Sequence, residues 1–395
     1  MAGRLPKRLL RGGALLALAQ ALSSRSGRAA PEEHQGSLGI ASVSLEQTRS
    51  SLAHQRQGPC SAEAVCVEFH DRLGNNLYQL ERALWLAHEL HFCFLAVPVP
   101  VSKEPISALV ATPEDGVVRL RPDAPNLSRA EIIERCSVSC LECAPRRRAA
   151  VTHLRVCSDW GPCDIGKRAL ARPTIQMLRN TMQESIVPSG LLRCDPASAQ
   201  LPADALVIHM RSGDSLEARS GFYPQPPCAY YAAVMRHGNG GRSFPSAVIV
   251  TEPDLRHPCI QALKTSFPNR VRVQSRSVTE DACTVASARH LAISFGTWGP
   301  ALSRLNSELR SLHVPFGEDN VTADEYGGSL ARMARHWFHQ AVYEGEMPYE
   351  QHVYSFPGYR CEWDSKSDHF AKMLRYGESR VVARTIPGRA SKSEP

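Results

Sequence analysis

The chain has 395 residues, 43% of them hydrophobic and 22% charged, which is typical of a globular protein with room for two domains and excludes a disordered chain. Of the formal net charge of +7, six units come from basic residues that precede the first acid, Glu32, so the rest of the chain would carry +1. This nearly neutral remainder lacks the broad basic field that binding to a nucleic-acid backbone needs.

Residues 1–30 have the pattern of a cleavable secretory signal: a basic start, an apolar run too short to span a bilayer, and small polar residues at the end. The same Arg- and Ser-rich, acid-free segment also fits an organelle transit peptide, which stays open as the alternative. Residues 31–58 have little apolar pattern and are expected to form a stem or linker. The expected location is therefore the lumen of the ER or Golgi, with at most peripheral membrane association.

Sequons and cysteines agree with a lumenal glycoprotein. N-glycosylation sequons begin at Asn126 and Asn320. Most of the 13 cysteines lie in the N-terminal half, where an oxidising lumen would pair them as disulfides and leave at least one thiol over. The spacing Cys136-x3-Cys140-x2-Cys143 would also hold the iron–sulfur cluster of a radical enzyme. Because this triplet follows a helical stretch rather than a first barrel strand, disulfides are preferred and the cluster enzyme is a minor alternative.

The N-terminal half begins with the pattern of a βαβ unit. An apolar run at 64–69 predicts a strand, leucines at helical spacing predict a helix over 74–90, and residues 91–99 predict a second strand. Residues 102–164 are rich in Pro and Cys and predict no regular structure. A helix is expected over 166–186, bent or interrupted before its internal proline.

The second half alternates short β-branched runs with helical segments, which predicts a parallel sheet with helices on both faces. The expected strands cover residues 205–210, 246–251, 270–275, 291–295 and 311–316. The expected helices cover residues 228–237, 257–267, 280–290 and 297–309. The sequence therefore predicts an α/β protein with an N-terminal domain over 59–198, a C-terminal Rossmann-like domain over 199–317, and a tail over 318–395 that is left without assignment.

Polar residues follow the strand expected over 205–210: His209, Arg211 and Asp214. In an open α/β sheet, ligands bind outside the carboxyl ends of the strands. Arg211 offers a planar, permanently charged fork that suits a phosphate or a carboxylate, and Gly213 lets the backbone turn closely past a ligand. An Arg–Asp pair that merely fixes the loop is the alternative interpretation.

A second strand end has similar chemistry. Ser294, Gly296 and Thr297 lie where the strand expected over 291–295 gives way to a helix, and backbone N–H groups at a helix start bind anions. The alternative is an ordinary threonine N-cap. Two anion-suited strand ends in one sheet point together to a diphosphate.

A third stretch, Gly74, Asn75 and Asn76, stands at the start of the helix expected over 74–90. Its amide and backbone N–H groups would meet sugar hydroxyls or phosphate across a cleft between the two domains. The alternative is that the asparagines only cap the helix.

Taken in order, the three stretches resemble motifs of the α-1,2-fucosyltransferases and protein O-fucosyltransferases. RLGNNLYQ resembles their Gly-Asn-Gln helix, HMRSGD their His-x-Arg-x-Gly-Asp motif and EDACTVASARHLAISFGTW their third motif, over about residues 65–317. The resemblance implies a GT-B fold, two Rossmann-like domains facing across a cleft. It also implies metal-independent, inverting transfer of fucose from GDP-fucose, a substrate rather than a cofactor, to a glycan or glycoprotein hydroxyl. The absence of an Asp-x-Asp triplet agrees with this.

The resemblance also assigns roles to single residues. Arg211 matches the arginine on the β-phosphate, His209 the motif histidine that shapes the site, and Asp281 the acid that reads the base. The phosphate-binding turn of the family is matched by Ser294, Thr297 and Trp298.

Two departures from the family motifs leave the donor open. Asn76 stands where the α-1,2 enzymes usually have Gln, and residues 296–299 replace their Ser-Thr-Phe turn, so another GDP-sugar is an alternative donor. A base on the acceptor hydroxyl would help an inverting displacement, and Asp214 and Glu217 are the candidates. From a different class, a non-catalytic lectin-like or scaffolding protein would keep the fold without turnover.

Overall fold

The structure is a computed structural model. It describes residues 59–67, 73–96, 116–139, 164–165, 168–169, 175–185, 194, 201–216, 225–316, 342, 347–359 and 368–388. The chain divides into two compact units, Met1–Arg56 and Gln57–Pro395, and every described residue belongs to the second. The expected signal and stem therefore lie outside the described residues, as does the sequon at Asn320. Among the helices of the described ranges, none is long and apolar enough to cross a membrane.

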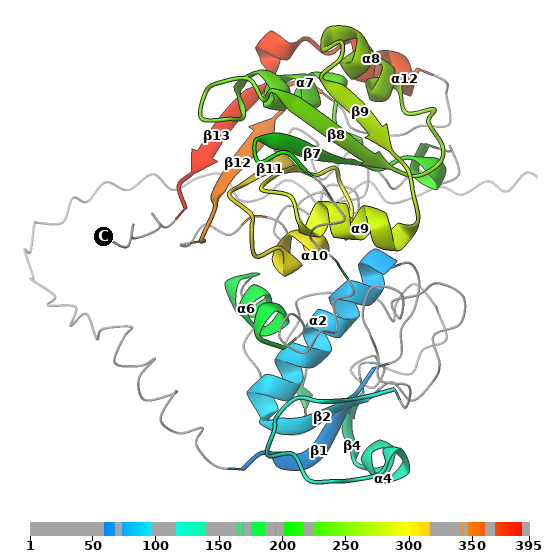
Figure 1. The fold of residues 1–395 in the computed structure, drawn as a ribbon, viewed down its shortest axis with the longest axis vertical. Coiled ribbons are helices and arrows are strands. Elements are labelled where there is room, and N and C mark those ends of the chain that lie inside the picture. Colours follow the sequence, from blue (N-terminus) through cyan, green and yellow to red (C-terminus); the bar gives the residue numbers. More distant parts are fainter. Residues whose placement is uncertain are drawn as a thin grey trace, which may run out of the picture. The chain divides into compact units, whose positions relative to one another are not determined.

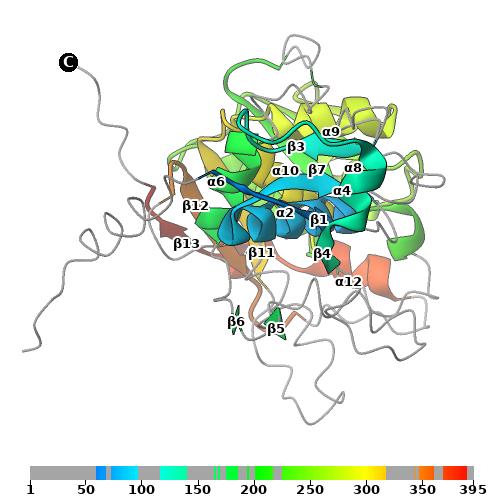
Figure 2. The ribbon, with the colours of Figure 1, turned by 90° about the horizontal axis from the view of Figure 1, so that it is seen from below.

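The first sheet has the strand order β3-β2-β1-β4 (Figures 1 and 2). Its strands are β1 (Ser61–Cys66), β2 (Phe92–Ala96), β3 (Val117–Arg119) and β4 (Cys136–Ser139). β1 pairs in parallel with β2 and β4, whereas β3 runs antiparallel to β2. Helix α2 (Leu73–Leu90) joins β1 to β2 and buries Leu77, Leu80 and Leu84 in the core. The predicted strand–helix–strand unit is confirmed.

Residues 102–164, left without assigned structure apart from the helical stretch before Cys136, contain three regular elements among their described positions. β3, β4 and a short helix, α4 (Arg129–Glu134), all lie in this segment. Ser128 and Glu131 form a capping box at the start of α4, in which the Ser128 N–H donates to Glu131 Oε2 at 2.7 Å. The helical stretch expected before Cys136 is thus confirmed, and the Ser-x-x-Glu spacing of the capping box marks its start in the sequence.

The helix predicted over 166–186 starts later than expected. Helix α6 covers Ile175–Ser185, whereas Arg168–Ala169 form strand β6, which pairs antiparallel with β5 (Asp164–Ile165). Pro173 explains the difference, because proline disfavours helical backbone at the residue before it and starts helices rather than continuing them.

The second sheet has the strand order β13-β12-β11-β10-β7-β8-β9, parallel throughout except for β13 (Figure 1). Its strands are β7 (Ala205–Met210), β8 (Ser246–Thr251), β9 (Val271–Gln274), β10 (His290–Ala292), β11 (Ser311–Phe316), β12 (Glu350–Ser355) and β13 (Val382–Ile386). Its helices are α7 (Cys228–His237), α8 (Pro258–Ser266), α9 (Val278–Ala286), α10 (Trp298–Leu305) and α12 (His369–Arg375), with 3-10 helices η2 (Gly213–Leu216) and η4 (Glu378–Arg380). The α/β class and the parallel Rossmann-like sheet are confirmed.

Alternate residues of β7 face two different cores. Leu206, Ile208 and Met210 pack with α7, α8 and α12, whereas Val207 packs with α9 and α10. Successive side chains of a strand point to opposite faces, so a strand without polar alternation must be covered on both. The continuous apolar run in the sequence therefore specifies a central strand of a doubly wound sheet.

The sheet continues beyond residue 317, into the tail that the sequence left without assignment. β12 pairs in parallel with β11, and β13 closes the edge antiparallel to β12. Neither strand has the apolar pattern typical of a strand in the sequence, because β12 buries polar side chains, including Gln351 and His352, and β13 is largely exposed.

Four disulfides join described cysteines: Cys60–Cys93, Cys66–Cys136, Cys194–Cys283 and Cys228–Cys259. The disulfide interpretation of the cysteine pattern is thus confirmed for these residues. Since Cys136 pairs with Cys66, it is not available to the iron–sulfur cluster alternative; its other ligands, Cys140 and Cys143, lie outside the described residues.

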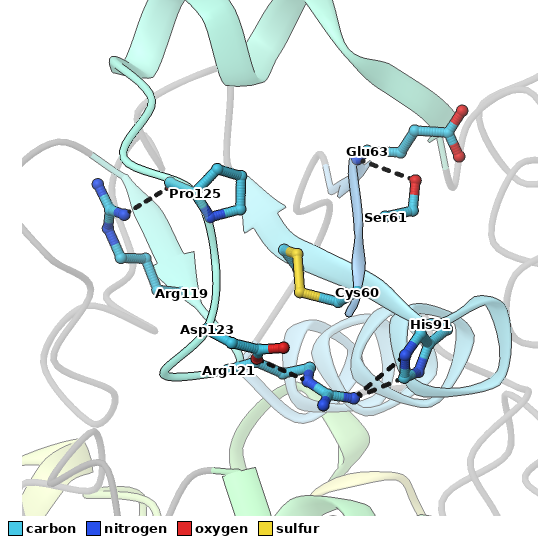
Figure 3. The surroundings of a disulfide bond; sticks show 9 residues. Cys60, Ser61, Glu63, His91, Arg119, Arg121, Asp123 and Pro125 are labelled. Atoms are coloured by element: carbon cyan, nitrogen blue, oxygen red, sulfur yellow. Dashed lines mark hydrogen bonds and ion pairs between the residues drawn. A yellow bond between two sulfur atoms is a disulfide. The ribbon is translucent and has the colours of Figure 1, made fainter. Parts of the chain in front are cut away.

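The Cys60–Cys93 bond ties the segment before β1 to β2 (Figure 3). Beside it, Arg121 donates to the His91 ring at 3.3 Å and to Asp123 Oδ1 at 3.0 Å. Arg119 donates to the Pro125 carbonyl at 2.9 Å (Figure 3). These bonds fix the chain that leaves β3.

The Cys228–Cys259 bond joins the first turns of α7 and α8, and its removal should destabilise the protein. Closing a loop of 31 residues restricts the unfolded chain, so we expect Cys228→Ala/Cys259→Ala to lower the free energy of unfolding by about 3–4 kcal/mol in urea titrations. Cys60→Ala/Cys93→Ala, with a separation of 33, is the matched variant and should lose a similar amount. A loss below about 1 kcal/mol in both variants would contradict loop closure as the cause.

Candidate functional site

Arg211 and Ser294 lie at the point where the strand order of the second sheet reverses. The chain proceeds from β7 outward to β8 and β9 on one side, and through β10, β11 and β12 on the other. Parallel open sheets bind ligands at this switch point, outside the carboxyl ends of the strands. Arg211 follows β7 and Ser294 follows β10, and the Arg211 N–H donates to Ser294 Oγ at 3.2 Å. The fold thus brings the two predicted strand ends into direct contact.

The Arg211 side chain lies over the turn that starts α10. A Cβ atom built on Gly296 would stand 3.6 Å from Arg211 Nη1 and 3.8 Å from its Cδ. Gly296 has φ +125, in the region that favours glycine, so the turn depends on this residue. The guanidinium is therefore placed next to the backbone N–H groups of a helix start, and both attract anions.

Thr297 occupies the N-cap position of α10, but its side chain does not cap the helix. The alternative interpretation, in which Thr297 is an ordinary N-cap, is therefore wrong. Trp298 begins α10, and its ring packs against the His209 ring with centroids 4.6 Å apart. Burial lowers the pKa of His209 to about 3, and the charge of Arg211 acts in the same direction. His209 is thus a neutral imidazole that supports the helix start.

The third predicted stretch, residues 74–76 at the start of α2, lies next to the start of α10. A Cβ atom at Gly74 would stand 2.6 Å from Thr297 Oγ1 and 2.9 Å from the Trp298 backbone nitrogen. The first turn of α2 therefore contacts the first turn of α10 so closely that only glycine fits. Two helix N-termini meet beside the Arg211 turn, and their dipoles add to its positive charge. Asn76 is buried at 1% exposure, and the Asn75 side chain lies outside the described atoms.

Asp281 lies at the same edge of the sheet, after β9. Its carboxylate accepts from Gln274 Nε2 at 2.9 Å and from the Arg276 N–H at 3.1 Å, which fixes the connection between β9 and α9. Burial raises the pKa of Asp281, against the effect of these hydrogen bonds. The contact with Gln274 places the Asp281 carboxylate next to the end of β9, which is two strands from β7 in the sheet.

The structure describes only part of the two carboxylates predicted to act as the catalytic base. Asp214 lies in η2, directly after the Arg211 turn, but its side chain lies outside the described atoms, and Glu217 lies outside the described residues. The structure adds Glu252, which the sequence reading missed. A Cβ atom on Gly213 would stand 1.7 Å from Glu252 Oε2, so this carboxylate lies against the turn. Its place directly after β8 was the available signal, because that position is also a strand end.

The residues around the Arg211 turn are suited to bind an anionic group on which negative charge increases during a reaction. A guanidinium and two helix N-termini converge at one strand-end turn, with the Glu252 carboxylate next to it. Such preorganised donors stabilise negative charge on a leaving group without a large rearrangement. Within the described ranges, no group of three or more His, Cys, Asp or Glu side chains is arranged to hold a metal ion.

Comparison with known proteins gives few matches. No protein-family model matches the chain, and no curated protein sequence matches it. Among solved structures, it is similar to ADP-heptose LPS heptosyltransferase II from E. coli, with 9% sequence identity and a TM-score of 0.34, over 69% of this chain and 88% of that chain. At this identity and TM-score, the functional interpretation depends on the residues of the site.

Gly74→Ala should separate the two helix starts. Alanine favours helix by about 1 kcal/mol over glycine, but overpacking costs about 1–3 kcal/mol, so we expect a net loss of stability together with weaker diphosphate binding. Thermal unfolding and nucleotide titration measure both. Gly377→Ala is the matched control, because its Cβ would meet only Ser379 Oγ, at an ordinary 3.8 Å. If nucleotide affinity is unchanged in Gly74→Ala, the contact between Gly74 and the start of α10 does not contribute to the binding site.

Proposed function

We propose that the chain is an inverting glycosyltransferase of the GT-B type that transfers fucose from GDP-fucose to a glycan or protein hydroxyl in the secretory lumen. The observation that supports this most is the position of Arg211 at the switch point between β7 and β10, over the start of α10. The resemblance of the three ordered motifs to those of the fucosyltransferases supports GDP-fucose as the donor in this proposal. The four disulfides are compatible with a lumenal location.

The proposed reaction is a single in-line displacement. The acceptor hydroxyl oxygen attacks C1 of the sugar, the bond from C1 to the β-phosphate oxygen breaks, and the GDP leaves with the electron pair. Arg211 and the N–H groups at the start of α10 stabilise the charge that develops on the phosphate. The hydroxyl proton passes to a carboxylate, for which Asp214, Glu217 and Glu252 are the candidates.

The remaining site residues take supporting roles in this proposal. His209 and Trp298 hold the start of α10 in place through their ring contact. Asp281, whose carboxylate lies next to the end of β9, two strands along the sheet from β7, is the candidate for the base end of a bound nucleotide. Gly74, Asn75 and Asn76 bring the start of α2 to the sugar side.

A donor screen with the secreted full-length chain tests the proposal. GDP-fucose, GDP-mannose, UDP-glucose and ADP-glucose are each incubated with the protein, and release of the nucleoside diphosphate is measured with and without a pool of glycan acceptors. We expect release from GDP-fucose, increased by acceptor. Release from another donor would replace the fucose assignment. Nucleotide binding without release would favour the lectin-like or scaffolding alternative, and no binding would overturn the proposal.

A further inference from the structure

A buried ion pair joins α2 to α10 at some distance from the strand ends. Arg304 Nη2 donates to Glu81 Oε2 at 2.8 Å, and Arg304 Nε bonds the other carboxylate oxygen. Both side chains are 1% exposed. The Arg304 guanidinium stacks on the Tyr78 ring, with Cζ 4.6 Å from the ring centroid. The ion pair is therefore bidentate, and the guanidinium also packs on the Tyr78 ring. This geometry restricts rotation and sliding of α2 relative to α10.

The pair has the same register as the contact at the helix starts. Glu81 follows Gly74 by seven residues in α2, and Arg304 follows Thr297 by seven residues in α10. Seven residues make almost two turns, so both contacts lie on one seam between helices that run parallel. The ion pair thus sits about 10 Å along the seam from the point where the two N-termini meet.

The end of α10 has a second support from α6. Arg179, which is 3% exposed, donates from Nη1 to the Ser303 carbonyl at 3.1 Å and to the Arg304 carbonyl at 3.4 Å. The α10 helix has 8 residues, too few for it to be stable by itself. Its position is therefore set by these side-chain contacts together with its apolar face.

Stability alone is a weak reason for a buried ion pair. Removing two charges from water is costly, and apolar residues of similar volume often replace such a pair without loss of stability. The best-supported use of buried polar pairs is to fix the register between helices. In this chain the fixed register determines how closely the start of α2 approaches the turn beside Arg211.

We propose that Glu81 and Arg304 are positioning residues: their ion pair sets the register of α2 against α10 and so the distance between the two helix N-termini of the donor site. This inference rests on the proposed function for the identity of the ligand. It assigns the pair no contact with the sugar or the nucleotide. Its consequence is that loss of the pair weakens diphosphate binding through the helix starts.

The test uses the full chain with the double variant Glu81→Leu/Arg304→Met, which replaces the pair by apolar side chains and keeps the buried volume. We expect a melting temperature within a few degrees of wild type, a GDP affinity at least tenfold weaker, and faster amide hydrogen exchange in residues 297–302. A merely structural pair would change the melting temperature without these two changes. Arg304→Lys, which keeps the charge but loses the fork, should give an intermediate affinity and covers the case in which the double variant does not fold.

The outcomes separate the inference from the proposed function. Wild-type GDP affinity together with wild-type exchange in residues 297–302, in either folded variant, overturns the positioning role. If the wild-type chain binds no nucleoside diphosphate while exchange at the start of α10 still increases in the variants, the positioning role stands and the proposed function fails. The Arg179→Met variant should increase exchange at the end of α10 rather than at its start.

Discussion

Replacing Arg211 with alanine is expected to abolish transfer, with kcat/KM reduced at least about 10³-fold. An arginine that stabilises a transferring phosphate typically contributes a factor of about 10³–10⁵. The melting temperature should change little, because the guanidinium faces the site beside Gly296 rather than the core. Donor turnover and thermal unfolding of the same preparation measure both quantities.

Two variants make the Arg211 result specific. Arg211→Lys keeps the charge without the planar fork and should retain an intermediate activity. Arg272→Ala makes the same chemical change at an exposed position of β9 and should leave activity unchanged. Full activity in Arg211→Ala would contradict the assignment of the diphosphate to the Arg211 turn.

Acidification from pH 7 to pH 5 should destabilise the protein strongly. His209, His257 and His313 are buried, and burial lowers the pKa of His209 and His257 to about 3 and that of His313 well below its usual value. In the unfolded chain these groups have a pKa near 6.5. The unfolded state therefore binds protons first, so stability is present above about pH 6.5 and is lost as the pH falls below it.

The expected size of the acid effect is large. Between pH 6.5 and pH 5, His209 and His257 each lower the free energy of unfolding by about 2 kcal/mol, so the two together lower it by about 4 kcal/mol, a large part of the stability of many domains. Urea unfolding at pH 7.5, 6.5, 5.5 and 5.0 measures it. His257 accepts from the Cys259 N–H as the N-cap of α8, so His257→Asn keeps a capping group and should clearly reduce the slope of the free energy of unfolding against pH. A slope that is the same in wild type and variant would contradict this cause.

The alternation of strands and helices in the second sheet could be predicted from the sequence because each element carries a local signal. β7, β8, β11 and α7 have the predicted bounds, since short apolar runs are flanked by turn residues. β12 and β13 could not be predicted this way. β12 buries polar side chains such as His352, which follows from the tertiary structure alone, and β13 is largely exposed and so lacks an apolar run.

The contacts that build the candidate site could not be predicted either. The two strand ends, after 205–210 and after 291–295, were predicted from their residues, but the strand order that makes β7 and β10 neighbours was not. The contact of Gly74 with Thr297 joins residues more than two hundred positions apart. Glu81 and Arg304 resemble the charged residues of a solvated helix face until the structure shows both to be buried. The residues of the site and their approach to one ligand could thus be predicted, whereas the direct contacts between them could not.

The most direct test of the central claim is a calorimetric titration of the full-length chain with GDP and, separately, with GMP. If Arg211 and the helix starts hold the β-phosphate, GDP binds at least tenfold more tightly than GMP. This difference then disappears in Arg211→Ala. Equal affinities for GDP and GMP in the wild-type chain, or binding of neither, would contradict this assignment of the β-phosphate.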